Sequence, residues 1–246
     1  MKKPILILGA TSGMARAAAI IWAKRGHDLF LASRDKNELE RIAADISIRY
    51  EVTVKHAPFS IENISQHEAF VAKAAQEMGD ISGVLLACGY LGDQAKAVSD
   101  FAEAQRIIDV NYTGACSVLT HCANILSKQQ SGFIAAISSV AGDRGRQSNY
   151  LYGSAKGGLS IFLDGLRNRL YSQKVHVLTI KPGFVDTSMT YGRPGMFLVA
   201  SPERVAEAIV RAADKRKNVI YVPWFWRIIM SIICSIPECL FKRLKL

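Results

Sequence analysis

The stretch that decides the fold of this chain is Pro4-Ile5-Leu6-Ile7-Leu8-Gly9-Ala10-Thr11-Ser12-Gly13-Met14-Ala15. It begins as a continuous apolar run, typical of a strand buried on both faces of a sheet, and a glycine-containing turn follows. Ala- and Ile-rich helical sequence then runs to about Lys24. Gly9 allows the tight turn, and Gly13 lets the backbone approach a phosphate at the helix N-terminus. The stretch therefore predicts a strand, turn and helix that bind a dinucleotide.

Apolar strand-like runs alternate with helical patterns along the rest of the chain. This alternation predicts an α/β fold, a Rossmann-type doubly wound parallel sheet of about seven strands in three α/β/α layers. We expect a single domain over residues 1–222 and an apolar, basic C-terminal segment over 223–246. The expected strands lie near 4–9, 28–33, 52–57, 83–87, 132–138, 175–181 and 218–222, and the expected helices near 13–25, 36–50, 64–78, 99–128, 150–172 and 202–216.

Length and composition fit a single domain in a reducing compartment without a bound metal. With 246 residues, 50% of them hydrophobic, the chain can bury a large core. Its five cysteines show no close Cys-x-x-Cys pairing, which favours a cytosolic compartment, and we expect Cys88 and Cys116 to be core residues. We expect no signal peptide, because Met1-Lys2-Lys3 runs directly into the first strand. The dispersed histidines predict no metal site.

The candidate chemistry lies in Tyr152-Gly153-Ser154-Ala155-Lys156, with Ser139 thirteen residues upstream of the tyrosine. Residues i and i+4 share one helix face, so Tyr152 and Lys156 can point into one cleft, although an amphipathic helix also produces this spacing by chance. We expect the Lys156 ammonium to lower the phenol pKa of about 10 and the Ser139 hydroxyl to hold a substrate oxygen. This pattern indicates reduction or oxidation of a carbon–oxygen bond.

Together these residues resemble the short-chain dehydrogenase/reductase family, from about residue 4 to residue 222. The family's asparagine motif is present as Asn111-Tyr112-Thr113-Gly114, which implies that Asn111 anchors a water on a proton-relay path behind Lys156. The segment Lys181-Pro182-Gly183-Phe184-Val185-Asp186-Thr187 looks like the family's Pro-Gly segment, which implies that Thr187 contacts the nicotinamide carboxamide.

The resemblance implies a full set of site residues. Two departures, Leu86-Ala87-Cys88-Gly89 in place of Asn-Asn-Ala-Gly and Pro58 near a common aspartate, weaken the contacts expected around the adenosine half. The catalytic set is Ser139, Tyr152, Lys156 and Asn111. The cofactor contacts are Gly9, Thr11, Ser12, Gly13, Met14, Ser33, Arg34, Gly89, Tyr152, Lys156, Pro182, Gly183, Val185 and Thr187.

Cofactor choice depends on the end of the second strand. An acidic side chain there would bind the ribose hydroxyls of NAD and repel a 2′-phosphate. This chain has Ser33 at that position and Arg34 after it, and a guanidinium suits a phosphate. We therefore expect NADPH. The alternative is that Arg34 is a solvated charge paired with Glu38, in which case NADH would serve equally well.

The C-terminal segment is the second unusual feature. Thirteen apolar-rich residues, 224–236, would span only about 20 Å as a helix, short of the roughly 30 Å hydrocarbon core of a bilayer. We expect this segment to lie at a membrane surface, because aromatic residues and cations flank it. The alternative is packing on a partner subunit, in a homodimer or homotetramer, or over the substrate cleft. Nucleic acid is not expected, because the aromatics are not interleaved with basic residues.

Several stretches, 88–93, 138–146 and 222–227 among them, resemble those family members that act on lipid-linked keto-sugars in cell-envelope biosynthesis. This resemblance implies reduction of a polyprenyl-phosphoryl 2-keto-pentose, an FAD-dependent oxidase as partner, and a cytoplasmic location at the inner face of the membrane. Arg144 and Arg146 are candidates to contact the substrate phosphate or are exposed loop charges. Two alternatives stay open: a reductase of a soluble ketone or acyl thioester, and an inactive cofactor-binding scaffold. A soluble-substrate enzyme should be indifferent to detergent and to deletion beyond Val222, provided that the fold survives, whereas a lipid-linked substrate predicts dependence on both.

Overall fold

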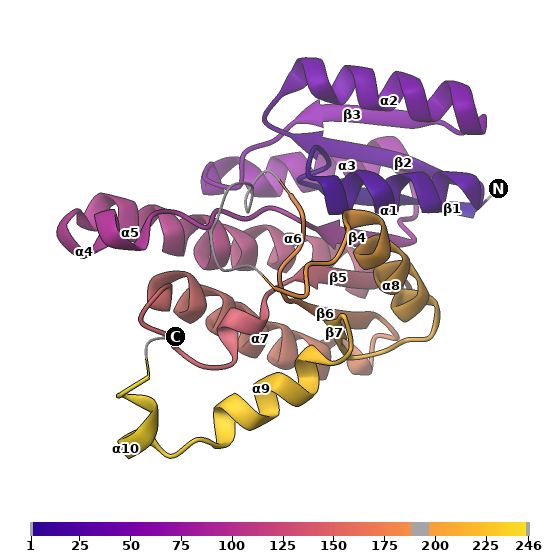
Figure 1. Cartoon of the computed structure of the whole chain (residues 1–246). Helices are drawn as coiled ribbons and strands as arrows, with labels where there is room; N and C mark the ends of the chain where they lie inside the picture. Colours follow the sequence, from indigo (N-terminus) through magenta and orange to yellow (C-terminus); the bar gives the residue numbers. More distant parts are fainter. Residues whose placement is uncertain (1, 188–196, 245–246) are drawn as a thin grey trace.

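The computed structural model describes residues 2–187 and 197–244, and it contains a seven-stranded sheet in which all adjacent strands are parallel. The strand order is β3-β2-β1-β4-β5-β6-β7, which confirms the expected doubly wound fold (Figure 1). The strands are β1 Lys2–Leu8, β2 His27–Ser33, β3 Val54–Pro58, β4 Gly83–Leu86, β5 Phe133–Ile137, β6 His176–Pro182 and β7 Val219–Val222.

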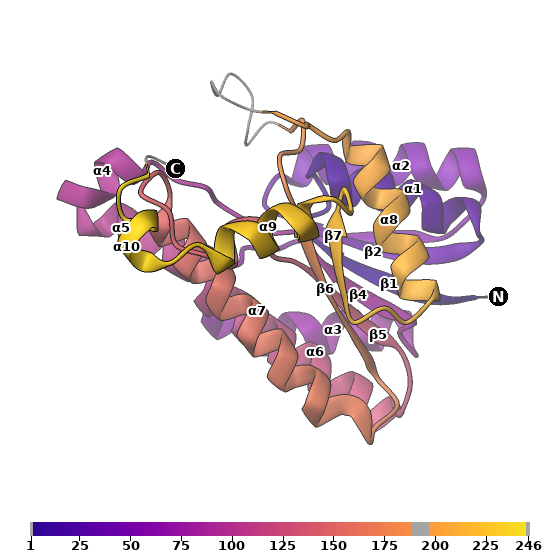
Figure 2. The same cartoon turned by 60° about the horizontal axis from the view of Figure 1, so that its bottom comes forward.

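Helices cover both faces of the sheet (Figure 2). Helices α1, α2 and α8 pack on one face with Ile5 and Ile7, and α3, α6 and α7 pack on the other with Leu6 and Leu8. Burial of both faces explains why β1 lacks polar alternation. The helices are α1 Gly13–Lys24, α2 Lys36–Tyr50, α3 His67–Met78, α4 Gln94–Ser99, α5 Phe101–Ile108, α6 Gly114–Gln129, α7 Tyr150–Tyr171, α8 Pro202–Asp214, α9 Trp226–Ser235 and α10 Glu238–Phe241.

The helix expected over 99–128 is interrupted. It divides into α5, a π-helical turn at Asp109–Thr113, and α6. Asn111 lies in that turn, and its Nδ2 donates to the backbone oxygen of Ile107 at 2.8 Å. Such turns occur often at functional sites, because they redirect a side chain without ending the helix. Helix α4, which precedes α5, was not expected from the sequence.

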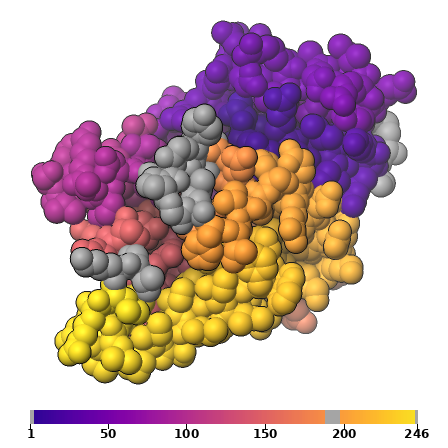
Figure 3. Space-filling view, viewed as in Figure 1, coloured from indigo at the N-terminus to yellow at the C-terminus, as the bar shows by residue number. Residues whose placement is uncertain are grey.

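The C-terminal segment packs along the edge of the domain as a ridge (Figure 3). On one side of α9, Trp226 and Met230 are buried against Val140. Trp224, Ile228 and Ile232, spaced four residues apart, are 69%, 53% and 61% exposed. The segment therefore has a packed face and an exposed apolar face, and no helix of the described chain is long and apolar enough to span a membrane. The sequence also predicts a substrate loop from Ser188 to Ala200, of which residues 188–196 lie outside the described residues.

Candidate active site

The dinucleotide cradle lies at the carboxyl edge of the parallel sheet, where β1 and β4 are adjacent. Gly9 has φ of 83°, and a Cβ on it would lie 2.8 Å from the backbone nitrogen of Cys88. Ser12 caps α1, whose first turn contains no acidic residue. The Gly9 backbone approaches Cys88 too closely for a side chain, and the turn lies beside the positive N-terminus of α1, which suits a pyrophosphate.

The cleft has two adjoining lobes, of about 250 and about 290 Å³, which share several residues around Cys88. The first lobe lies over the β1 turn and the end of β2, and the second lies over the ends of β5 and β6. Each of the fourteen residues predicted to contact the cofactor lines one or both lobes. The cleft therefore fits the two halves of a nicotinamide dinucleotide.

Ser139, Tyr152 and Lys156 meet in the second lobe. Ser139 follows β5 and its Oγ accepts a hydrogen bond from the Ala141 backbone at 3.1 Å. Tyr152 and Lys156 lie one turn apart on α7, and the Lys156 Nζ lies 5.8 Å from the centre of the tyrosine ring. The expectation that these three residues share one cleft therefore agrees with the geometry.

A buried hydrogen-bond network fixes α7 against the end of β5. Lys156 Nζ donates to the Ile137 oxygen at 2.9 Å. The Ser138 hydroxyl donates to the backbone oxygen of Lys156 at 2.8 Å and lies 2.8 Å from the Ser160 hydroxyl. Because all of these groups are buried, leaving any of them unpaired would cost free energy. The network sets the position of Lys156.

The acid–base groups have perturbed pKa values, but not in the expected way. Burial raises the pKa of Tyr152 to about 12, and hydrogen bonding from Ser139 opposes the shift. Burial also lowers the pKa of Lys156 to about 8, and the charge of Cys88 opposes this. We expected the ammonium to lower the tyrosine pKa. In this structure desolvation dominates instead, because the ammonium is directed at the Ile137 oxygen.

Asn111 is fully buried, and its amide is committed to the backbone. Its Nδ2 donates to the oxygens of Tyr90 and Ile107, and its Oδ1 accepts from the Tyr90 nitrogen at 3.2 Å. These bonds hold the loop after β4, which carries Cys88 and Gly89. One lone pair of Oδ1 stays free to accept from a water, so the relay role implied by the resemblance stays a prediction.

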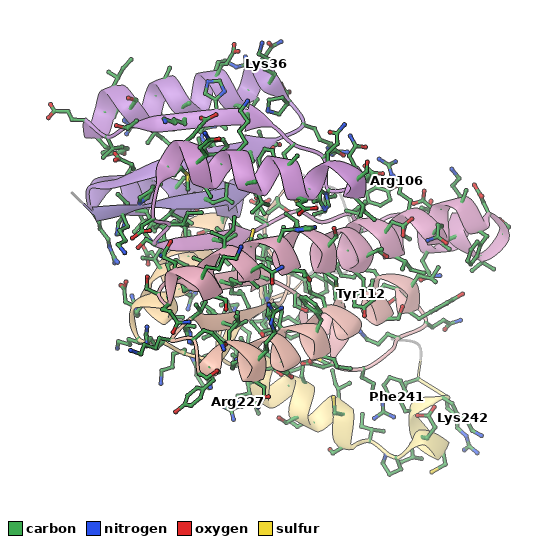
Figure 4. The ribbon with its side chains drawn as sticks, turned by 180° about the vertical axis from the view of Figure 1, so that it is seen from behind. Lys36, Arg106, Tyr112, Arg227, Phe241 and Lys242 are labelled. Carbon is green, nitrogen blue, oxygen red and sulfur yellow. The ribbon has the colours of Figure 1, made fainter. Side chains whose placement is uncertain are left out.

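Arg34 does not pair with Glu38. Its guanidinium lies 3.7 Å from the carboxylate of Glu62, while Glu38 pairs with Arg16 and Arg41. Arg106, at the end of α5, also pairs with Glu62 at 3.1 Å and lines the first lobe (Figure 4). The sequence reasoning missed Arg106, because nothing in its local sequence shows that α5 ends beside the cofactor cradle.

Arg144 and Arg146 have different roles. Arg144 donates to the oxygens of Ile233, Cys234 and Ile236 at the end of α9, pairs with Glu238 at 3.0 Å, and stacks on Phe241 at 3.7 Å. It therefore clamps the C-terminal segment and lines neither lobe of the cleft, and its contact with a substrate phosphate stays an untested expectation. Arg146 lines the second lobe.

Trp226 is a site residue that the sequence reasoning missed. It begins α9, is 2% exposed, and lines the second lobe together with Tyr152. Its ring packs on Phe184 and Phe197 at centroid distances of 5.7 and 5.6 Å. Deletion beyond Val222 would remove this wall of the cleft, so that deletion does not separate a soluble substrate from a lipid-linked one.

A cleft that can hold a nicotinamide dinucleotide beside acid–base residues is typical of Rossmann-type oxidoreductases. Residues 3–194 match the family described as short chain dehydrogenase. Over 98% of this chain, an uncharacterized oxidoreductase of Mycobacterium tuberculosis is 36% identical and one of Streptomyces coelicolor is 34% identical, and the alignments cover 96% of each relative. The chain belongs to the short-chain dehydrogenase family and is an NAD(P)-dependent oxidoreductase.

Solved structures share the fold. A short-chain dehydrogenase from Sphingobium yanoikuyae in complex with NADPH superposes with a TM-score of 0.81 and 23% identity, over 96% of this chain and 97% of that chain. An alcohol dehydrogenase from the archaeon Thermococcus sibiricus, complexed with 5-hydroxy-NADP, gives a TM-score of 0.78 and 22% identity, over 89% of this chain and 96% of that chain. At these identities the likeness concerns architecture and not substrate.

Proposed function

We propose that this oxidoreductase reduces a keto group, with Tyr152 as the proton donor. The observation that supports this is the meeting of Ser139, Tyr152 and Lys156 in the lobe beside the phosphate cradle. When bound, the nicotinamide cofactor supplies the hydride that adds to the carbonyl carbon. A tyrosine with a pKa of about 12 stays protonated at neutral pH, as a proton donor must. Ser139 polarises the carbonyl by a second hydrogen bond.

Lys156 and Asn111 would restore the tyrosine proton. With a pKa of about 8, Lys156 can both give and accept a proton near neutral pH. The free lone pair of Asn111 Oδ1 would hold the water that connects Lys156 to solvent. The lysine ammonium also stabilises the tyrosinate that forms as the proton leaves.

NADPH is the proposed cofactor. Arg34 and Arg106 lie at the first lobe with one carboxylate, Glu62, between them, so that end of the cleft has an excess of positive charge. Ser33, at the end of β2, bonds the Thr11 hydroxyl at 2.8 Å and presents no charge to a 2′-phosphate. Two structural neighbours of the same fold were solved with NADPH and 5-hydroxy-NADP, which is in keeping with this choice.

For the substrate we propose a polyprenyl-phosphoryl 2-keto-pentose. The sequence around Cys88, Ser139 and the C-terminal segment resembles the reductase subunit of decaprenylphosphoryl-ribose 2′-epimerase, whose partner is an FAD-dependent oxidase that makes the keto-sugar. A lobe of about 290 Å³ has room for a nicotinamide and a sugar, while a long isoprenoid must lie outside it. The exposed face of α9, beside the lobe wall formed by Trp226, offers an apolar surface for that purpose.

The same face supports a peripheral location at the inner surface of the cell membrane. Arg227 lies near the start of α9 and Lys242 follows α10, so cations stand at both ends of the exposed apolar face (Figure 4). Apolar residues with flanking cations suit the interface of an anionic bilayer. The enzyme would then meet its substrate where the sugar phosphate leaves the membrane.

A reductase of a soluble ketone or acyl thioester is the second candidate, because the lobe itself needs only a small carbonyl compound. Oxidation of NADPH, with NADH in parallel, should be measured for purified protein given a polyprenyl-phosphoryl 2-keto-pentose in detergent micelles. Rapid NADPH oxidation supports the lipid-linked substrate. No oxidation by protein that still binds NADPH would contradict it and favour the soluble substrate.

A further inference from the structure

The second lobe carries positive charge that none of its described lining residues neutralises. Arg146 and Lys156 line this lobe, and none of its described lining residues is a carboxylate. The Nε of Arg146 is buried and has no hydrogen-bond partner, and the guanidinium forms no ion pair with any residue that the structure describes. A buried guanidinium nitrogen without a partner is costly, and such a group suits an anionic ligand.

Asp143 is the carboxylate whose charge acts on Arg146, but its oxygens are already used. Lys181 Nζ lies 2.5 Å from one oxygen, and the Tyr221 hydroxyl donates to the other at 2.9 Å. The Asp143 side chain is 9% exposed, so this network is closed to solvent. Lys181 therefore compensates Asp143, and Arg146 keeps its own charge.

A second polar group at the same lobe also lacks a partner. The Oδ1 of Asn149 is buried without a hydrogen bond, although Asn149 precedes α7 where a side chain often caps the helix. Oxygen and nitrogen of such an amide can exchange places by a flip, so Asn149 can offer either a donor or an acceptor. Arg146 and Asn149 are joined by a backbone hydrogen bond of 3.1 Å, which keeps the two side chains on one turn.

We propose that Arg146 and Asn149 form a subsite for a phosphate group carried by the carbonyl substrate, one turn before Tyr152. This inference rests on the proposed function, because the subsite lies in the lobe of the catalytic tyrosine. A guanidinium fits a phosphate with two parallel hydrogen bonds, and the amide supplies a third. The subsite would fix the distance between phosphate and reacting carbonyl, which selects phosphorylated ketones over neutral ones.

The test compares two matched substrates, geranylphosphoryl 2-keto-pentose and the neutral geranyl 2-keto-pentoside, by NADPH oxidation. The wild-type protein should prefer the phosphorylated compound by roughly 10- to 100-fold in kcat/KM, the usual effect of a charged hydrogen bond. Arg146→Gln should remove this preference by lowering kcat/KM much more for the phosphorylated compound than for the neutral one, while Arg146→Lys should restore part of it. Arg49→Gln, on the exposed side of α2, removes the same charge far from the cleft and should have no effect.

Binding gives a readout that does not need turnover. With saturating NADP⁺ present to fill the cofactor site, geranyl phosphate should raise the melting temperature of the wild-type protein and not of Arg146→Gln. That result without reduction of either ketone would support the subsite and contradict the proposed substrate. Equal kcat/KM of the wild-type protein for the two ketones would overturn the subsite but not the proposed reductase activity. Equal stabilisation of the wild-type and Arg146→Gln proteins by geranyl phosphate would also overturn the subsite.

Discussion

The indole ring of Trp226 lies directly against the backbone of Gly183, so that a methyl group on Gly183 would overlap the indole nitrogen. Gly183 belongs to the segment after β6 that lines the second lobe, and Trp226 comes from the C-terminal segment. The contact joins the wall of the cleft to α9. The C-terminal segment is thus part of the active site as well as a surface element.

Gly183→Ala is expected to lower both stability and activity, because the new methyl group displaces the Trp226 ring. Overpacking of this kind costs about 1–3 kcal/mol. Thermal unfolding and kcat/KM should both fall, and Trp226→Phe in the same chain should restore part of each. Gly165→Ala on α7, where a Cβ would meet nothing within 4 Å, is the control and should stabilise by about 0.5–1 kcal/mol. Equal effects of the two glycine substitutions would refute the contact.

Tyr152→Phe should bind NADPH with unchanged affinity yet lose turnover by several orders of magnitude, because only the phenolic proton is removed. Tyr150→Phe, on the same helix and 44% exposed, is the matched control and should keep normal turnover. Cofactor binding is followed by fluorescence and turnover by NADPH oxidation. Undiminished turnover in Tyr152→Phe would remove the acid–base assignment.

Lys156→Met should make the cofactor-free protein more stable at neutral pH. The Lys156 pKa of about 8 in the folded chain, against 10.5 in the unfolded chain, means that the unfolded chain binds more protons between these values. Burial of the charged lysine therefore lowers the free energy of unfolding by its full amount below about pH 8, and this loss vanishes as the pH rises past 10.5. The pKa shift corresponds to a loss of roughly 3 kcal/mol.

Melting temperatures of the two proteins at pH 7 and near pH 10.5 measure this effect. The Lys156→Met protein should melt higher at pH 7, and the difference should shrink at high pH, offset in part by the lost hydrogen bond to Ile137. Turnover should be lost at both values. A gain in stability that does not change with pH would show that the lysine charge is not its source.

Ser33→Asp should shift cofactor preference from NADPH towards NADH, because a carboxylate at the end of β2 repels a 2′-phosphate and binds ribose hydroxyls. Glu62→Gln should do the opposite and tighten NADPH, since it frees Arg34 and Arg106. The ratio of kcat/KM for the two cofactors should move by tenfold or more for Ser33→Asp. The two variants should therefore change this ratio in opposite directions. A change in the same direction would contradict the idea that charge at the first lobe selects the cofactor.

Ile232→Glu should weaken membrane binding and leave reduction of a water-soluble ketone unchanged, because Ile232 is 61% exposed on the face of α9 away from Trp226. Cosedimentation with phosphatidylglycerol vesicles, compared with phosphatidylcholine vesicles, measures the binding. Ile48→Glu on α2, also exposed, introduces the same charge elsewhere and is the control. The membrane location would be wrong if wild-type protein did not sediment or if both variants behaved alike.

Much of the site follows from local sequence. The turn at Gly9, the spacing of Tyr152 and Lys156 on one helix, and the position of Ser139 after a buried strand each depend on neighbours within a few residues. Parallel strands place their carboxyl ends at one edge, so these separate motifs had to converge once the alternation of strands and helices was recognised. For this reason the sheet and the catalytic cleft could be predicted.

The sequence by itself determined the parallel sheet and the convergence of the glycine turn, Ser139, Tyr152 and Lys156 on one cleft, because backbone periodicity and short motifs carry that information. Only the tertiary structure decided that Arg144 clamps the C-terminal segment while Arg146 stays unpaired, and that Trp226 forms a wall of the cleft. It also decided the direction of the Tyr152 pKa shift. Pairing of distant charges and desolvation depend on which surfaces become buried together, and that is set by packing across the whole chain.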